Sequence, residues 1–432
     1  MKPIKLILVI LFLISFGINA QQIYLDPNFG KEGVAVFGGI DVYSMETDQD
    51  GNVFAVGYFL ENTDDYRHYG KKVVVLKIDS QGNLDKNFGS DGIVITEVEF
   101  ELLRPSLITR QPDSKIIVAS QCKGNLCNLA LLRYLPNGNL DDSFGKNGIS
   151  IINSNSHWID GFSLLPLADN SLFINASFGD EDGYSYPAIA KIKENGSLDE
   201  SFQDKGILYI KSMSGSKLCS KILSLSDGNF LGLLASCKSL IGGADYYYLK
   251  FDHKGDLDNT FGNNGILKES CKDETVSTYY TTAFEQQDGK IIIGSPSVSY
   301  KRLHSDGVLD ESFNADKVSG RDIISQSDGK LLFVGPYLKS TIRVIRVTNN
   351  GSIDFDISTP KLVGDYYYFK FINDRSFIAS GVDKDKNLVF TKVIIDPDAT
   401  LIPDINNEES ISVTQESENI SVRSESPIQL IQ

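Results

Sequence analysis

The chain has 432 residues, a formal net charge of −16 and a hydrophobic fraction of 41%. A chain of this length can bury a large core, and length alone predicts two or three domains. The excess of 57 acidic over 41 basic side chains argues against nucleic acid or an anionic membrane as the main partner.

The first 20 residues have the pattern of a secretory signal peptide. Lys2 and Lys5 precede an apolar run, Leu6 to Phe16, and Ala20 offers a small residue for cleavage before Gln21. The apolar run is too short to span a bilayer as a permanent helix, and no later segment is long and apolar enough to do so. We therefore expect a chain that the secretion machinery exports and that has no membrane span.

A short motif, clearest at Leu84–Gly92 as Leu-Asp-Lys-Asn-Phe-Gly-Ser-Asp-Gly, recurs along the chain. Its phenylalanines are 42 to 59 residues apart, a period that indicates stacked or radially arranged supersecondary units. One body of linked repeats therefore replaces the two or three domains that length suggests. The seven copies, which we call Phe-Gly turns, lie at Leu25–Gly33, Leu84–Gly92, Leu140–Gly148, Leu198–Gly206, Leu257–Gly265 and, in weaker form, Leu309–Phe313 and Ile353–Phe355.

The first Phe-Gly turn shows why the motif has this form. Asp26 can cap backbone N–H groups, Pro27 fits the first position of a helical turn, and Gly30 suits a left-handed residue at its end. We expect one helical turn in each copy, with the Leu and Phe side chains buried and the second glycine leading into a short strand.

A second signal, a tight polar turn between two apolar runs, occurs once in every repeat. Asp-Gly in this setting is typical of a β-hairpin, because both central residues can adopt positive φ. These Asp-Gly turns lie at Asp50-Gly51, Asp113-Ser114, Asp169-Asn170, Asp227-Gly228, Asp288-Gly289, Asp328-Gly329 and Asn373-Asp374. A third strand, and a fourth after the Phe-Gly turn, complete each repeat. Four short strands repeated seven times predict an all-β chain whose residues 21–396 form a seven-bladed β-propeller of four-stranded blades.

The two ends of the repeat region predict how the ring closes. The first Phe-Gly turn precedes any hairpin, so the strand Val34–Phe37 belongs to no blade of its own. The last repeat, Tyr366 to Ile395, has three strands and lacks a fourth. We expect Val34–Phe37 to supply that strand, which would remove two exposed sheet edges and close a monomeric ring.

The residues of the two kinds of turn resemble delta-60 repeats, whose pattern combines an Asp-Gly-Lys hairpin with Leu-Asp-x-Ser-Phe-Gly. Lys290 and Lys330 follow their Asp-Gly pairs, whereas Asn52 and Asn229 replace that lysine. The resemblance extends from Ile23 to Asp396 and implies a β-propeller, but it implies no activity.

Alternate connections of a propeller blade lie on opposite faces, so the Asp-Gly and Phe-Gly turns are expected to share one face, which we call the regular face. The opposite, variable face receives connections of differing length, at Glu61–Gly70, Gln121–Asn128, Gly179–Tyr186 and Cys237–Asp245. Variable loops on a rigid scaffold are the usual place for function, and we therefore place any ligand there.

All five cysteines lie toward the variable face, where a secreted chain permits disulfides. Cys219 and Cys237 are symmetric about a predicted hairpin turn and are expected to face each other, and Cys122 and Cys127 flank a four-residue loop. Closing the first of these loops would contribute about 3 kcal/mol in the chain-entropy model. The alternative is five reduced, partly buried thiols, and Cys271 has no predicted partner.

Aromatic side chains on or near the variable loops are the candidate ligand contacts, because exposed rings can stack on sugars or peptides. The packing alternative is that at least one ring of each tyrosine triplet faces a blade interface, since side chains alternate along a strand. The candidates are Tyr66, His157, Trp158, Tyr184, Tyr186 and Tyr246.

No motif predicts a catalytic, cofactor or metal site. The four histidines are scattered through different repeats without metal-ligand spacing. The segment Asp48–Asn52 begins like a calcium loop, but Phe59 stands where the pattern needs glutamate, which favours a solvated hairpin turn. For Asp180–Asp182, exposed loop charge is the favoured interpretation and weak calcium binding is the alternative. The nucleophile elbow, the P-loop and the repeated boxes of sialidases do not occur.

Residues 397–432 form an acidic, apolar-poor linker that ends in strand-like pieces. The final stretch, Ile420 to Gln432, resembles the opening of the C-terminal sorting domain used by type IX secretion, without the strand and turn that complete such a domain. The resemblance implies export through the periplasm and across the outer membrane.

The leading hypothesis is a secreted or cell-surface, non-catalytic propeller that binds an extracellular protein or glycan through its variable face. One alternative is a glycan-active or other hydrolase whose carboxylates converge only in three dimensions. A second alternative is a purely structural component of the cell surface.

Overall fold

The computed structural model describes residues 22–59, 70–123, 129–153, 163–179, 185–203, 205–211, 216–237, 244–271, 282–295, 298–315, 318–396, 412–416 and 419–423. Every regular element in these ranges is a β-strand. Within them, no helix meets the length and hydropathy that a membrane crossing requires. Contacts divide the chain into two compact units, one of which is Ile23–Ile394 and the other Met1–Gln22 with Ile395–Gln432.

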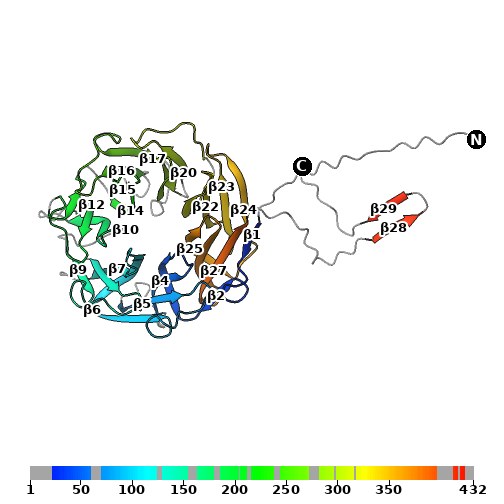
Figure 1. The fold of residues 1–432 in the computed structure, drawn as a ribbon, viewed down its shortest axis with the longest axis horizontal. Helices are drawn as coiled ribbons and strands as arrows, with labels where there is room; N and C mark the ends of the chain where they lie inside the picture. The colour runs from blue at the N-terminus through cyan, green and yellow to red at the C-terminus, as the bar shows by residue number, and fades with distance from the viewer. Residues whose placement is uncertain are drawn as a thin grey trace, which may run out of the picture. The chain divides into compact units, whose positions relative to one another are not determined.

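The sheets of the unit Ile23–Ile394 are arranged in a ring around a central axis (Figure 1). The first sheet spans two repeats, because β6 pairs with β5 through its first residues and with β7 through its last ones. Its seven strands are β3 (Ile40–Thr47), β4 (Val53–Phe59), β5 (Gly70–Ile78), β6 (Ile93–Arg110), β7 (Ile116–Lys123), β8 (Leu129–Tyr134) and β9 (Ile149–Ile152).

The next four sheets follow the repeats one by one, with antiparallel strands paired in chain order, as the hairpin turns predict. Three have four strands and one has three. They are β10 (Ser163–Pro166), β11 (Leu172–Gly179), β12 (Ser185–Ile192) and β13 (Ile207–Tyr209); β14 (Ser216–Ser224), β15 (Phe230–Cys237), β16 (Ala244–Phe251) and β17 (Ile266–Cys271); β18 (Thr282–Glu285), β19 (Ile291–Ser295) and β20 (Val298–Leu303); and β21 (Asp322–Ser325), β22 (Leu331–Pro336), β23 (Ile342–Val347) and β24 (Ile353–Ser358).

The last sheet combines the C-terminal hairpins of the propeller region with N-terminal strands. Its strands are β25 (Gly364–Asn373), β26 (Ser376–Asp383), β27 (Leu388–Asp396), β1 (Gln22–Leu25) and β2 (Val34–Phe37). β2 runs antiparallel to β27, with Val34 opposite Thr391 and Phe37 opposite Leu388. In the second unit, β28 (Ser412–Glu416) and β29 (Asn419–Arg423) form a hairpin.

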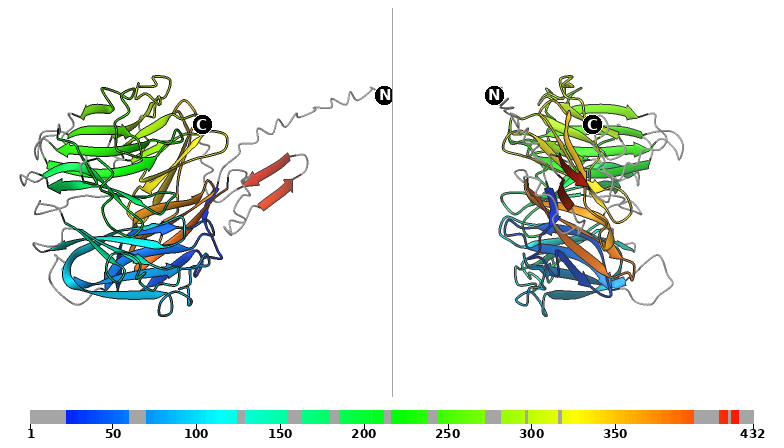
Figure 2. Two further views of the ribbon diagram at one scale, coloured as in Figure 1. Left: turned by 60° about the vertical axis from the view of Figure 1, so that its left-hand side comes forward. Right: turned by 90° about the vertical axis from the view of Figure 1, so that its right-hand side faces the viewer.

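The hydrophobic core lies between successive sheets, which pack face to face (Figure 2). Phe144, for example, is 2% exposed and packs with Ile117 of one sheet and Ile174 of the next. The expected burial of the Phe-Gly phenylalanines is confirmed for six repeats, and Phe355 of the seventh is only partly buried.

The Phe-Gly turns are hydrogen-bonded turns, which corrects the expectation of a helical turn. The Phe88 N–H donates to the Asp85 carbonyl at 2.9 Å, and the Gly92 N–H donates to the Phe88 carbonyl at 2.8 Å. Gly89, Asp91 and Gly92 have φ values of 57°, 53° and 91°. Residues with positive φ cannot continue a right-handed helix, so they turn the chain directly into the next strand.

Six of the seven Phe-Gly turns, all except Ile353–Phe355, also contact the turn after the third strand of the following repeat. The Gly89 N–H donates to the Asn137 carbonyl at 2.8 Å, and a Cβ on Gly138 would lie only 2.9 Å from the Gly89 nitrogen. The sixth copy has Asn314 in place of the first glycine of the motif and keeps this contact. The Asn314 N–H donates to the Asn350 carbonyl at 2.9 Å. The turn therefore joins neighbouring repeats.

Substituting Gly138 tests this contact against a matched glycine. Gly138→Ala and Gly228→Ala both place a side chain at positive φ, but a Cβ on Gly228 would meet nothing within 4 Å. We expect Gly228→Ala to lower the free energy of unfolding by about 1 to 2 kcal/mol, the cost of left-handed backbone, and Gly138→Ala to lower it clearly more. Urea denaturation measures both, and equal effects would contradict the close packing at Gly138.

Candidate functional site

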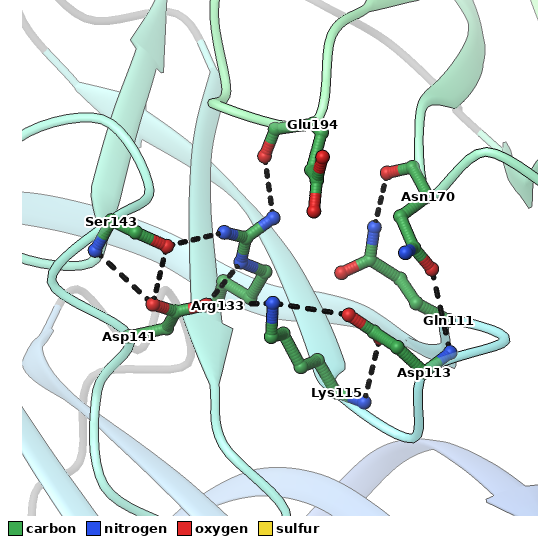
Figure 3. Close-up of polar contacts among 8 residues, drawn as sticks. All are labelled: Gln111, Asp113, Lys115, Arg133, Asp141, Ser143, Asn170 and Glu194. Atoms are coloured by element: carbon green, nitrogen blue, oxygen red, sulfur yellow. Dashed lines mark hydrogen bonds and ion pairs between the residues drawn. The ribbon is translucent and has the colours of Figure 1, made fainter.

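Arg133 on β8 is the centre of a polar cluster on the regular face (Figure 3). Its Nε donates to Asp141 Oδ2 at 2.8 Å, Nη2 to Ser143 Oγ at 3.0 Å, and Nη1 to the Glu194 carbonyl of the next repeat at 2.5 Å. The guanidinium lies 4.6 Å from the ring centroid of Phe144, and Arg133 is only 1% exposed. The cluster therefore joins one Phe-Gly turn to its own strand and to the following repeat.

The Asp-Gly turn reaches the same cluster. Lys115, directly after this turn, has its Nζ 3.0 Å from Asp113 Oδ2 and 3.4 Å from Asp141 Oδ2. This contact between the two kinds of turn confirms that they share one face, as predicted (Figure 3).

A basic side chain pairs with the Phe-Gly aspartate in every repeat, at N to O distances from 2.6 to 3.2 Å. The pairs are Lys392–Asp26, Lys77–Asp85, Arg133–Asp141, Lys191–Asp199, Lys250–Asp258, Arg302–Asp310 and Arg346–Asp354. The sequence prediction missed these pairs, although in six of them the basic residue lies eight positions before the aspartate. The seventh pair, between Lys392 and Asp26, joins the two ends of the repeat region.

All seven of these aspartates have a lowered pKa. At Asp141, burial tends to raise the pKa, but the hydrogen bonds from Ser143 and the charges of Arg133 and Lys115 outweigh that effect. At Asp310, the hydrogen bond from the Ser312 hydroxyl is the largest cause of the lowered pKa. Carboxylates held ionised in this way are unsuited to donate a proton in catalysis.

These lowered pKa values predict a loss of stability in acid. Because each folded-state pKa lies below the unfolded value of about 3.9, the pairs stabilise the fold above that pH, and the contribution is lost as the pH falls further. We expect a melting temperature that changes little from neutrality to about pH 5 and falls steeply below about pH 4. Asp310→Asn should lower it at pH 7 and flatten the acid decline, whereas Asp91→Asn, an exposed control, should do neither.

The predicted ligand contacts are only partly within the described residues. Tyr186 is partly buried on β12, with its ring centroid 5.7 Å from Lys211 Nζ. Tyr246 is 4% exposed and packs in a core cluster with Phe261, so it is a core residue, and its assignment as a ligand contact is corrected in favour of packing. Four candidates lie outside the described residues: Tyr66, His157, Trp158 and Tyr184.

The strand register contradicts the predicted opposition of Cys219 and Cys237. Cys219 is opposite Leu234 and Cys237 is opposite Ser216, with a β-bulge between Cys219 and Lys221. Three residues of strand, about 10 Å, therefore separate the two cysteine positions along the ladder. This separation exceeds the span of a disulfide, so the bridge inferred from sequence symmetry is wrong.

Cys122 on β7 is 6% exposed and is disulfide-bonded. Its predicted partner, Cys127, lies outside the described residues. The Cys122–Cys127 pairing stays a prediction, and the masses of tryptic peptides with and without reductant will test it.

The segment that begins like a calcium loop is a hairpin turn. Asp48 Oδ1 accepts hydrogen bonds from the Asp50 N–H at 3.1 Å and the Asn52 N–H at 2.9 Å, and Asp48 Oδ2 accepts one from Asn52 Nδ2 at 2.9 Å. Both carboxylate oxygens thus cap the turn, as the hairpin interpretation predicts. Within the described residues, no group of three or more His, Cys, Asp or Glu side chains is arranged to hold a metal ion. Asp180–Asp182 lies outside them.

A cavity of about 560 Å³ lies on the regular face between the Asp-Gly turns of the first two repeats and the end of β10. Its walls combine polar and charged side chains with two prolines. They are formed by Glu46, Thr47, Asp48, Gln49, Asp50, Thr109, Arg110, Gln111, Pro112, Ser114 and Pro166. This cavity is a candidate site in the described part of the chain.

Arg110, the last residue of β6, is the unusual side chain in this cavity. Its guanidinium lies 4.9 Å from the ring centroid of Phe54, and its Nε is buried without a hydrogen-bond partner. Among the described residues, Arg110 forms no ion pair. Arg110 thus lines the cavity with its Nε lacking a protein acceptor, unlike the arginines that pair with turn aspartates.

A family model described as a domain of unknown function (DUF5122) beta-propeller matches residues 111–144, 167–202, 286–313 and 326–354. Each matched segment runs from an Asp-Gly turn to the following Phe-Gly turn and contains the second and third strands of one repeat. The chain is a β-propeller repeat protein. No curated protein matches it.

Three solved structures show weak likeness to this repeat protein. The WD40 beta propeller domain of Doa1 is 13% identical, covering 86% of this chain and 97% of that chain with a TM-score of 0.43. Prolyl oligopeptidase B from Galerina marginata is 12% identical, covering 84% and 52% with a TM-score of 0.46. A protein of unknown function from Dyadobacter fermentans is 8% identical, covering 87% and 98% with a TM-score of 0.39.

Proposed function

We propose that this repeat protein is a secreted or cell-surface, non-catalytic scaffold that binds an extracellular protein or glycan through its variable face. The observation that carries the proposal is the set of seven basic–aspartate pairs. In these pairs the aspartates of the Phe-Gly turns stabilise the turns, which is a structural and not a catalytic role. A ring held rigid on one face and carrying loops of varied sequence on the other is suited to presenting a binding surface.

We infer further that the propeller has seven blades and that β2 completes the last one. The Lys392–Asp26 pair supports this inference, because it repeats the contact made within the other repeats. The Asp26 N–H donates to the Lys392 carbonyl at 2.9 Å, just as the Asp85 N–H donates to the Lys77 carbonyl at 2.9 Å. The first Phe-Gly turn thus occupies the position that the last repeat lacks.

The proposed route of export rests on the two ends of the sequence. Residues 1–20 have the pattern of a signal peptide, and residues 420–432 resemble the opening of a type IX sorting domain. Fractionation of a bacterium that has type IX secretion and expresses the chain tests this route. We expect the protein on the cell surface or in the medium, and we expect it in the cytoplasm when residues 1–20 are deleted.

A binding screen of the mature chain against extracellular glycans and surface proteins tests the function itself. Two variants shorten the variable loops at residues 61–69 and 124–128, and a control lengthens the Asp-Gly turn at Gly289, where a Cβ would meet nothing within 4 Å. We expect the loop variants to lose the partner and the control to keep it. The proposal is contradicted if every partner found in the screen still binds both loop variants, turnover of a glycan favours the hydrolase alternative, and the absence of any partner favours the structural one.

A further inference from the structure

We propose that the cavity beside Arg110 is a second binding site, on the regular face, for a neutral and hydroxyl-rich ligand such as the end of a glycan chain. The site is separate from the variable loops, so it goes beyond the function proposed above. Its volume of about 560 Å³ is within the range of about 300 to 1,000 Å³ that small-molecule sites occupy.

Arg110 supplies the hydrogen-bond donors of the cavity. A guanidinium has five N–H donors in a planar fork, and stacking on Phe54 holds the Arg110 fork in one orientation. Its Nε is buried without a partner, and the guanidinium lines the cavity without an ion pair or hydrogen bond to the described residues. The ligand must therefore bring acceptor atoms to Arg110.

The charge of the cavity argues against an anionic ligand. Glu46, Asp48 and Asp50 line the same cavity as the single cation Arg110. Lys370 pairs with Glu46, but the single Arg110 guanidinium does not offset Asp48 and Asp50 as well, so the cavity disfavours a further negative charge. The net charge of −16 on the whole chain acts in the same direction.

Two of the three carboxylates already accept hydrogen bonds from the protein. Glu46 Oε2 accepts a hydrogen bond from Lys370 Nζ at 3.0 Å, and both oxygens of Asp48 cap the hairpin turn. Asp50 is exposed on the cavity wall. A hydroxyl group fits this arrangement, because its oxygen accepts from Arg110 while its hydrogen is donated to Asp50.

The remaining lining agrees with a sugar. Two adjacent hydroxyls match the paired donors of a guanidinium, and Pro112 and Pro166 offer apolar walls for the C–H face of the ring. A cationic ligand would lie beside the Arg110 charge and would leave its donors unsatisfied. A neutral polyol is thus the ligand class that satisfies both the donors and the acceptors of the cavity.

The fifth repeat shows a different contact at the equivalent position. Glu285 occupies the position that corresponds to Arg110, three residues before the turn aspartate. Its carboxylate accepts hydrogen bonds from the Ser226 N–H at 2.7 Å and the Ser226 hydroxyl at 2.8 Å, and thereby ties two successive Asp-Gly turns together. No such bond joins Arg110 to the preceding turn in the described structure, and the cavity lies between those two turns.

Affinity electrophoresis of the full mature chain tests this proposal. The gels contain laminarin, xylan or galactomannan as neutral probes, polygalacturonate as an anionic probe, and gelatin as a peptide probe. We expect at least one neutral polysaccharide to retard the protein. Arg110→Lys, which keeps the charge but removes the fork, should abolish the retardation, and Asp50→Asn should weaken it. Arg343→Lys, an arginine paired with Asp356, is the control that should migrate as the parent chain does.

The results of this experiment distinguish binding at the cavity from binding at the variable face. Retardation by polygalacturonate or gelatin alone, no retardation by any neutral probe, or equal retardation of Arg110→Lys and the parent chain would each overturn the proposal. Variants with shortened variable loops should keep the retardation. If they lose it while Arg110→Lys keeps it, the ligand binds the variable face, and the function proposed above stands without this second site.

Discussion

Replacing Arg133 with methionine is expected to lower the free energy of unfolding by about 3 to 5 kcal/mol, because it leaves a nearly buried carboxylate without its main partner. The side chains of Arg133 and Asp141 are only 1% and 8% exposed. The substitution also removes the donors to Ser143 Oγ and the Glu194 carbonyl. Lys115 remains 3.4 Å from Asp141, which places the expected loss toward the lower end of the range.

Two further variants make this prediction specific. Arg343→Met breaks a more exposed pair with Asp356, whose side chains are 21% and 34% exposed, and is expected to change stability by about 0 to 1 kcal/mol. The double substitution Arg133→Met with Asp141→Leu removes both charges and should recover part of the loss. Urea denaturation followed by circular dichroism measures all three. A loss no larger than that of Arg343→Met would show that the cluster does not hold the repeats together.

Replacing Phe29 with alanine is expected to destabilise the protein as strongly as Phe144→Ala, by about 3 to 5 kcal/mol. Phe29 and Phe144 are 0% and 2% exposed, but Phe29 belongs to the first Phe-Gly turn, which packs against the last hairpins. In a ring completed by the N-terminal strand, loss of the Phe29 contacts weakens the whole propeller. In an open array, it would only detach the N-terminal segment.

The control for Phe29→Ala comes from the same segment. Tyr24 is 43% exposed, so Tyr24→Ala is expected to change stability by less than about 0.5 kcal/mol. Thermal denaturation should show one cooperative transition for Phe29→Ala, shifted to lower temperature. A separate early transition with an unshifted main transition would contradict the closed ring.

Local turn chemistry explains why much of the fold was predictable from the sequence. The Asp-Gly and Phe-Gly turns set the hairpins and strands, since residues that adopt positive φ, such as Gly89 and Gly92, act within a few residues of the chain. The period of the phenylalanines likewise predicted their burial. The predicted helical turn was wrong, because the residue types of the Phe-Gly motif are equally common at a helix N-cap and in a β-turn.

Features that depend on distant or irregular contacts were decided by the tertiary structure. The hairpin is centred at Asp227, one residue before the predicted centre, and a β-bulge after Cys219 shifts the register by one further residue, so Cys219 is opposite Leu234 and not Cys237. The partner of Asp26 lies at the other end of the repeat region, in Lys392, where no local spacing reveals it. Nothing in the sequence distinguishes Arg110 from other basic residues. Only the three-dimensional structure shows that it stacks on Phe54 and that its Nε has no protein acceptor. The sequence by itself determined the repeat and its strands because hairpin signals are local. The structure decided which charges meet, because ion pairing depends on distance in space.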